Sequence, residues 1–224
     1  MKTTLKRAAA PTAAVLLVLA GAYMFRESHY TIISLLVAAA ACIGFAFAFE
    51  RRELTSRYAV LVAVMTALSI VGRFIFAPLP AFKPITAIVI LSGMYLTAEG
   101  GFLTGALTAL ISNMYFGHGV WTPFQMLAWG MIGLMAGVFA NQLKKSRLLL
   151  LAFGALTGVF YSWVMDIWTV LWYNEGFDLG LYKAALITAI PFTVTYAVSN
   201  VIFLLLIGGS FGRKLGRAVT LIER

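Results

Sequence analysis

The chain is poor in charge, in histidine and in cysteine, and each shortage excludes a class of protein. Only 11% of its 224 residues are charged, whereas about a quarter are charged in an ordinary soluble domain. The single cysteine, Cys42, excludes a disulfide framework and a cysteine metal cluster. The only two histidines, His29 and His118, have no Cys, His or Glu at metal-ligand spacing beside them, which excludes a zinc enzyme.

Motifs for nucleotide binding and acid–base catalysis are missing as well. No glycine-rich loop ends in Lys-Ser or Lys-Thr, so the chain cannot bind ATP in the P-loop manner. No pair of carboxylates lies within an apolar run, and such pairs are common acid–base catalysts. Glu175 and Asp178 are close in sequence but fall in a polar loop. We therefore expect a protein that is not an enzyme.

Long apolar runs dominate what is present. Apolar residues make up 62% of the chain, and its mean hydropathy is +0.93. A helix needs about 20 predominantly apolar residues to cross a bilayer. The sequence therefore predicts an all-α, multi-pass membrane helical bundle, in which two N-terminal helices precede a core of six. The runs cover residues 13–25, 30–49, 58–76, 85–98, 102–116, 123–140, 148–172 and 184–209.

The placement of the basic residues predicts an orientation. A net charge of +9 could indicate nucleic acid, but the Lys and Arg residues lie between apolar runs and not on one soluble face, so no nucleic-acid partner is expected. When the loops are assigned alternately to two sides, 13 of the 17 basic residues fall on one side. By the positive-inside rule that side is the cytoplasm, and both termini belong to it.

These charges also divide the chain into three regions. We expect an N-terminal transmembrane hairpin and basic cytoplasmic linker over residues 1–57, the six-helix core over 58–210 and a basic cytoplasmic tail over 211–224. The first run, with Ala20-Gly21-Ala22 near its end, also resembles a signal peptide. We expect an uncleaved helix, because small residues are ordinary in membrane helices. Cleavage would leave the orientation of the later helices unchanged.

Polar and aromatic residues gather on the side opposite the cytoplasm. Charges at membrane depth, such as Arg73 and Asp166, are costly unless they face protein or water, so this gathering predicts an outward-facing aromatic cavity with few polar anchors. Belts of Trp and Tyr at the membrane interfaces are the alternative explanation for part of the set. The predicted substrate-binding residues are Arg73, Phe76, Lys83, Asn113, Tyr115, His118, Trp121, Gln125, Trp129, Asp166, Trp172, Tyr173 and Asn200.

Small residues recur at helical spacing in the core. Ala59, Ala63 and Ala67 lie on one face of the first core helix, where they would let another helix approach closely. That approaching helix could belong to this chain or to a partner. Later runs carry six further small residues that predict tight packing inside the core: Gly93, Gly101, Gly105, Gly130, Gly133 and Gly137.

These features resemble a known family. A six-helix core, an alanine ladder on its first helix, and long outer loops after the first, third and fifth core helices resemble energy-coupling factor (ECF) transporter S components. These are the vitamin-binding membrane subunits of bacterial ABC-type importers. The resemblance spans about residues 55–210. The segments GRFIFAPLPAFKPITAIVI (72–90) and ALISNMYFGHGVWTPFQMLAWGMIGLMAG (109–137) are similar to a subgroup that includes cobalamin-specific members.

The resemblance implies partners and a mechanism. Ala59, Ala63 and Ala67 would match the face that docks on the ECF transmembrane coupling subunit, and two ATPase subunits would supply the energy. S components capture substrate outside the cell and topple within the membrane to release it inside. The chain would accordingly lie in the bacterial cell membrane. The N-terminal hairpin departs from the six-helix pattern, and we assign it no function.

The substrate is expected to be large, mostly uncharged and flat, because the chain has five tryptophans and further aromatics in its outer loops. Cobalamin or a related corrinoid, as transported substrate and not as a permanently bound cofactor, is the first expectation; a flavin or a pterin fits too. A stand-alone secondary transporter is the competing class, but Asp166 is its only intramembrane acidic candidate and no internal repeat is evident. A membrane scaffold would bind no vitamin.

Overall fold

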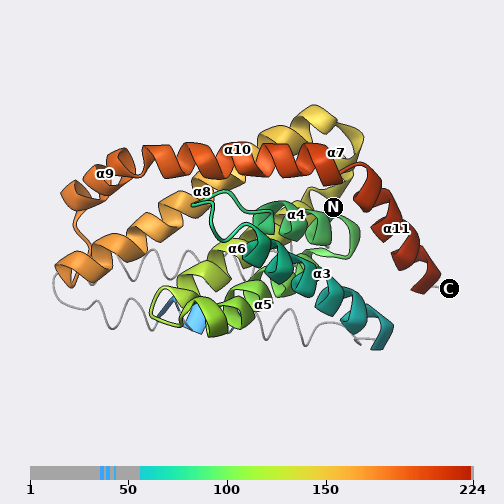
Figure 1. Cartoon of the computed structure of the whole chain (residues 1–224), viewed down its shortest axis with the longest axis horizontal. Coiled ribbons are helices and arrows are strands. Elements are labelled where there is room, and N and C mark those ends of the chain that lie inside the picture. The colour runs from blue at the N-terminus through green and yellow to red at the C-terminus, as the bar shows by residue number, and fades with distance from the viewer. Residues whose placement is uncertain (1–35, 38, 41–42, 44–55, 223–224) are drawn as a thin grey trace.

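A computed structural model describes residues 36, 37, 39, 40, 43 and 56–222 (Figure 1). Within residues 56–222 it contains nine helices and no strand, which confirms the all-α bundle. Three of these helices, over Arg57–Ile75, Arg147–Asn174 and Ile190–Ile207, are long and apolar enough to cross a membrane. The helices are α3 (Ser56–Ile75), α4 (Ile85–Tyr95), α5 (Ala98–Phe116), α6 (Thr122–Val138), α7 (Ala140–Lys145), α8 (Arg147–Asn174), α9 (Leu179–Thr188), α10 (Ile190–Ile207) and α11 (Ser210–Ile222).

Helices α4, α5 and α6 form the centre of the bundle, and glycines bring their backbones into contact. A Cβ atom on Gly93 would lie 2.0 Å from the Gly133 carbonyl oxygen, and one on Gly101 would lie 2.4 Å from the same atom. Every residue of α4 except Tyr95 is buried. Close backbone approach at small residues is a common way for membrane helices to pack. The tight packing predicted from the glycines is confirmed.

A methyl group at Gly133 is expected to destabilise the bundle. In Gly133→Ala the new Cβ would lie 2.2 Å from the Gly101 carbonyl oxygen, and backbone cannot move aside as a flexible side chain can. Overpacking of this kind costs about 1–3 kcal/mol. The midpoint of thermal unfolding in detergent measures the effect. Gly209→Ala is the control, because its nearest neighbour would lie 3.7 Å away; equal midpoints for the two variants would contradict the packing argument.

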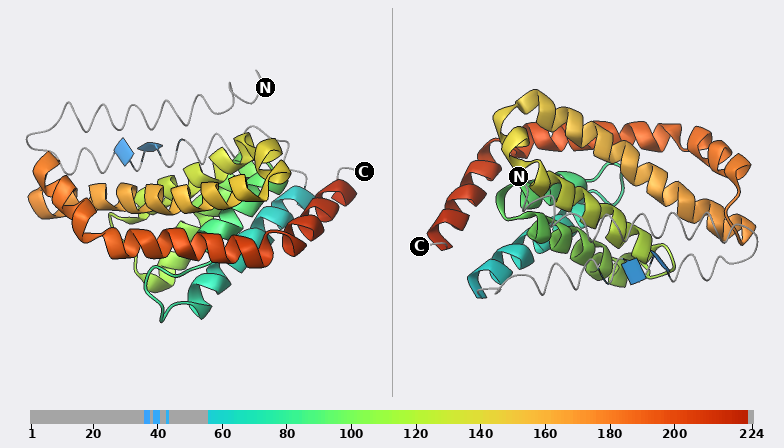
Figure 2. Two further views of the ribbon diagram at one scale, coloured as in Figure 1. Left: turned by 90° about the horizontal axis from the view of Figure 1, so that it is seen from above. Right: turned by 180° about the vertical axis from the view of Figure 1, so that it is seen from behind.

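Helices α8 and α10 run side by side along one edge of the bundle (Figure 2). Gly158 allows this approach, since a Cβ atom there would lie 2.6 Å from the backbone nitrogen of Ala197. The prediction of a single helix over residues 184–209 is wrong. The chain forms α9 and then α10, with a break at Ala189. Pro191 lies in the first turn of α10, and because it has no amide hydrogen it interrupts the hydrogen-bond ladder at this point.

The boundary between α4 and α5 also differs from the prediction. Residues 99–101 were expected to join two helices, but they form the first turn of α5. Thr97 caps that helix by accepting a hydrogen bond from the Gly100 amide at 3.0 Å. The acidic Glu99 in the first turn suits the positive end of the helix dipole. The capping threonine therefore starts α5 at Ala98, before the predicted start of the apolar run at residue 102.

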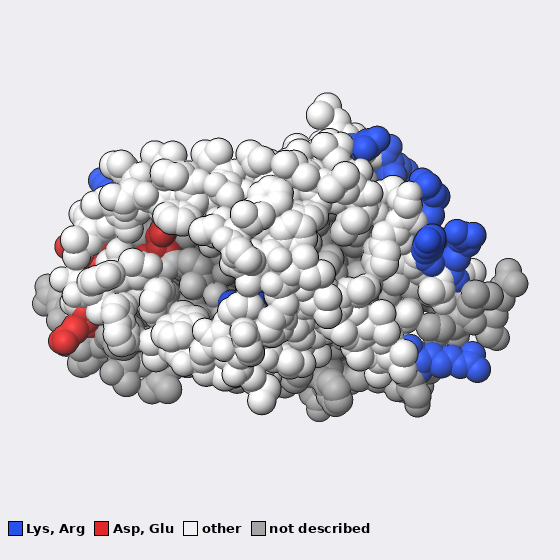
Figure 3. Space-filling model, viewed as in Figure 1, with Lys and Arg blue, Asp and Glu red and all other residues white. Residues whose placement is uncertain are grey.

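Basic side chains gather at one end of the molecule, over α11 and the segment around α7, whereas the acidic side chains visible on this face lie toward the opposite end (Figure 3). We call the first of these the basic end. Most of the region predicted as a tail forms α11, which packs on α4 where Gly212 faces the ring of Tyr95. The predicted N-terminal hairpin lies almost wholly outside the described residues.

Candidate functional site: a cavity between α3, α6, α8 and α10

A cavity of about 130 Å³ lies where the last turn of α3, the first half of α6 and the middle of α8 and α10 meet. The space-filling surface is hollowed below α10, with basic atoms visible in the hollow (Figure 3). The cavity is lined by Arg73, Ala81, Lys83, Ile85, Thr86, Gln125, Trp129, Tyr161, Tyr196 and Asn200. Five of these, from three different helices and a loop, were predicted as substrate-binding residues: Arg73, Lys83, Gln125, Trp129 and Asn200.

A continuous chain of hydrogen bonds runs along one side of this cavity. Arg73 Nη1 donates to the Ser112 hydroxyl and, at 2.8 Å, to Asn113 Oδ1. Asn113 Nδ2 in turn donates to Gln125 Oε1 at 2.8 Å. Gln125 Nε2 then donates to the Tyr161 hydroxyl at 3.3 Å. The network joins α3, α5, α6 and α8, so it fixes the directions in which the polar atoms face.

The network leaves hydrogen-bond donors unused. Both Arg73 bonds come from Nη1, and its Nε and Nη2 groups donate to no other described residue. Guanidinium carries five N–H donors in a rigid plane. The Tyr161 hydroxyl accepts from Gln125 and keeps its own proton available. The cavity therefore presents a planar cation and a hydroxyl donor to any molecule that enters it.

Aromatic rings form another part of the cavity wall. Trp129 and Tyr161 are stacked, with ring centroids 5.0 Å apart and an interplanar angle of 10°. The Tyr196 ring packs edge-on against the Tyr161 ring, with centroids 5.1 Å apart. The Arg73 guanidinium carbon lies 4.5 Å from the centroid of the Phe116 ring and 5.7 Å from that of Trp129, within cation–π range. This wall suits a flat, aromatic ligand.

Two of the predicted polar anchors donate their hydrogen bonds to backbone carbonyl oxygens of the protein itself. Lys83 Nζ donates to the carbonyl oxygens of Phe76, at 2.6 Å, and of Leu79, so its ammonium group holds the loop before α4 in shape. Burial, and secondarily the charge of Arg73, lower the pKa of Lys83. Asn200 Nδ2 donates to the Gly154 carbonyl oxygen at 3.0 Å and so ties α10 to α8. Both residues line the cavity, but their side-chain nitrogens already have partners.

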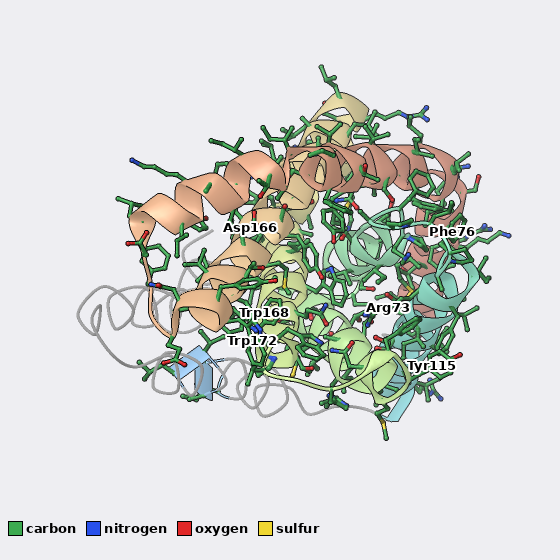
Figure 4. All side chains as sticks on the ribbon, turned by 60° about the vertical axis from the view of Figure 1, so that its left-hand side comes forward. Arg73, Phe76, Tyr115, Asp166, Trp168 and Trp172 are labelled. Atoms are coloured by element: carbon green, nitrogen blue, oxygen red, sulfur yellow. The ribbon has the colours of Figure 1, made fainter. Side chains whose placement is uncertain are left out.

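A second group of polar and aromatic side chains lies on α8 and the start of α6. The Trp168 ring packs edge-on against the Trp121 ring, with centroids 5.7 Å apart, and its centroid lies 6.3 Å from that of the Trp172 ring. Figure 4 shows Asp166, Trp168 and Trp172 along α8, apart from Arg73 on α3. Asp166 is 9% exposed, and its Oδ2 atom has no hydrogen-bond partner among the described residues. The same holds for Trp168 Nε1. An acceptor and a donor are thus buried without protein partners in the described part of the chain.

The remaining predicted residues do not line the cavity. Phe76 packs against Phe82 and Phe203. Tyr115 is 73% exposed and contacts Phe74, at the edge of the bundle (Figure 4). Tyr173, at the end of α8, is 81% exposed. The remaining two, His118 and Trp172, are exposed as well, and the His118 ring lies 3.4 Å from the Thr122 hydroxyl. Within the described part of the chain, no three His, Cys, Asp or Glu side chains come together as metal ligands.

Sequence reasoning missed Tyr161, which lies at the centre of the site. Its ring stacks on Trp129, its hydroxyl ends the polar network, and it is 5% exposed. Tyr161 lies seven residues, or about two helical turns, before Trp168, so both fall on one face of α8. That spacing was the available signal, but an aromatic residue within an apolar run is typical of ordinary core.

The alanine ladder lies on the surface. Ala59, Ala63 and Ala67 are all exposed. The neighbouring Val60 and Val64 are 59% and 48% exposed. Residues at the intervening positions, such as Val62 and Met65, are buried against the bundle instead. The face with the alanines is therefore not used for packing against the described helices of this chain.

An all-α bundle with three apolar helices of membrane-spanning length defines an integral membrane protein. Residues 53–217 match the family described as ECF-type riboflavin transporter, S component, and the chain belongs to that family. It is a transport subunit for vitamin uptake. The match supports the S-component class predicted from the sequence but lends no support to the cobalamin subgroup. No curated protein and no solved structure matches the chain significantly.

Proposed function

We propose that this chain captures a flavin, riboflavin or a close analogue, in the cavity beside Arg73 and delivers it to an ECF importer. The observation that carries the proposal is the pairing of a stacked Trp129–Tyr161 wall with the unused donors of Arg73 and Tyr161. The riboflavin description of the family adds support.

The chemistry of a flavin complements this site. Its tricyclic ring is flat and aromatic, and one edge carries two carbonyl oxygens beside a ring N–H. The ring can extend the Trp129–Tyr161 stack, while the guanidinium of Arg73 donates to the carbonyl edge. The hydroxylated side chain of riboflavin needs acceptors and donors as well, and Asp166 Oδ2 and Trp168 Nε1 are buried polar atoms without partners among the described residues.

A corrinoid suits the cavity less well than a flavin. Small-molecule sites usually enclose about 300–1,000 Å³, and this cavity encloses about 130 Å³. A riboflavin molecule already requires the site to widen into the hollow below α10. A corrinoid macrocycle with its peripheral amides is several times larger than a flavin ring. We therefore place riboflavin ahead of cobalamin, which was the first expectation from sequence.

Transport in this proposal depends on other chains. The exposed alanine face of α3 would dock on a transmembrane coupling subunit, and two ATPase subunits would supply the energy by hydrolysing ATP. The basic end would face the cytoplasm, and the protein would lie in the bacterial cell membrane with both termini inside. Toppling of the chain in the membrane would then carry the loaded cavity inward.

Thermal stabilisation of the detergent-purified chain against a panel of vitamins tests the substrate. We expect riboflavin to raise the unfolding midpoint, because a ligand that binds only the folded state adds about 2.7 kcal/mol at a hundredfold excess over its Kd. Cobalamin and folate are expected to give no shift. The variant Trp129→Ala should lose the riboflavin shift, whereas Trp163→Ala, an exposed tryptophan on α8, should keep it. A shift with cobalamin alone would contradict the flavin assignment.

A further inference from the structure

A second and larger cavity, of about 530 Å³, lies at the basic end of the molecule. It is lined by the end of α4, the short helix α7, the start of α8, the end of α10 and the start of α11. The riboflavin proposal makes no use of it. Its lining residues include three cations, Lys144, Arg147 and Arg213, and a set of apolar side chains from α8 and α10.

The three cations have no acidic partner in the lining of the cavity. None of the residues that line the cavity is acidic, and within residues 56–222 none of the three cations forms an ion pair. Lys144 Nζ lies 4.7 Å from the centroid of the Tyr95 ring, and Arg147 Nη2 donates to the Leu205 carbonyl oxygen at 3.5 Å. These contacts leave most of the donors on the three cations unused. Cations gathered without carboxylates favour an anion, and arginine in particular favours phosphate.

Apolar side chains from α8 and α10 also line this cavity, and some of them reach the surface of the bundle. Leu150 and Leu204 in its lining are buried, whereas Leu205 and Leu206 on α10 are 41% and 68% exposed. In a helix that crosses the membrane, such exposed leucines near its end face lipid chains. A ligand that joins a phosphate to long apolar chains matches both the cations and the leucines, and free phosphate matches only the cations.

We propose that this cavity binds the headgroup of an anionic phospholipid, with the phosphate among Lys144, Arg147 and Arg213 and an acyl chain along the leucines of α10. Basic clusters beside membrane helices attract anionic lipids from the cytoplasmic leaflet. The site would fix α7 and α11 at the membrane surface. This inference rests on the second cavity alone and stands whether or not the vitamin proposal holds.

Adjacent residues supply a matched pair of variants. All four of Lys144, Lys145, Arg213 and Lys214 are exposed, but only Lys144 and Arg213 line the cavity. The double variants K144Q/R213Q and K145Q/K214Q therefore remove the same charge from the same two helices. Riboflavin-dependent stabilisation serves as the folding check if the chain binds that vitamin, and gel filtration serves otherwise.

The experiment counts lipids bound to the full chain by native mass spectrometry in detergent. We expect phosphatidylglycerol to bind wild type and K145Q/K214Q, and K144Q/R213Q to bind it about tenfold more weakly. Phosphatidylcholine should bind weakly to all three. Equal binding of the two lipids, or an equal loss in both double variants, would overturn the proposal. Displacement of phosphatidylglycerol by millimolar inorganic phosphate would assign the site to free phosphate instead and overturn the lipid.

Discussion

Replacement of Ala63 by tryptophan is expected to stop vitamin uptake without weakening vitamin binding. Ala63 lies at the middle of the exposed alanine face of α3, whereas the cavity touches α3 only at Arg73, in its last turn. A large ring on a face where two helices meet closely costs about 1–3 kcal/mol, which is about 5- to 150-fold in the population of the docked complex. Uptake by whole cells and riboflavin binding by the purified chain measure the two effects separately.

The control for this variant is Ala152→Trp, which places the same ring at an exposed alanine on α8. We expect Ala152→Trp to support uptake like wild type. If Ala63→Trp lost vitamin binding, the alanine face would belong to the fold and not to a docking surface. If both variants took up vitamin normally, α3 would not be the face that meets the coupling subunit.

Removal of the Arg73 guanidinium is expected to weaken vitamin binding about a hundredfold. Arg73 offers unused donors to the cavity and also fixes Asn113, and through it Gln125. Hydrogen bonds to a charged group contribute about 1.5–3 kcal/mol each, so two lost bonds amount to at least about 3 kcal/mol, or roughly a hundredfold in Kd. Titration of riboflavin against Arg73→Met in detergent measures the loss.

Two further variants separate charge from geometry. Arg57→Met removes an arginine from the other end of α3 and should bind riboflavin like wild type. Arg73→Lys keeps the positive charge but loses the planar fork of donors, so we expect it to recover only a small part of the affinity. Wild-type affinity in Arg73→Met would show that the vitamin binds elsewhere. Full rescue by lysine would mean that charge alone matters.

Much of this site was predictable because polar groups in an apolar run must find partners. Arg73, Asn113 and Gln125 are costly at membrane depth, and the structure joins them in one network. The extents of α3, α6 and α8 likewise follow from the apolar runs and their flanking polar residues. The cost of burial is a property of each residue type, so it can be inferred from the amino-acid sequence alone.

Directions and local breaks were harder to predict. Asn113 and Tyr115 are two residues apart on α5, so they point about 200° apart around its axis, and only Asn113 faces the interior. Lys83 looked like a cationic anchor, but the carbonyl oxygens of its own loop occupy its ammonium group. The break at Ala189 depends on Pro191 and on how α9 packs on α8. Such features depend on helix rotation and on neighbours distant in sequence.

The most direct test of the central claim is riboflavin uptake into lipid vesicles that contain the purified chain. The account predicts uptake only when an ECF coupling subunit and its two ATPase subunits are reconstituted with the chain and hydrolysable ATP is present on the ATPase side. A non-hydrolysable ATP analogue should give none. Uptake by the chain alone, driven by a pH or sodium gradient, would contradict the account and identify a stand-alone secondary transporter.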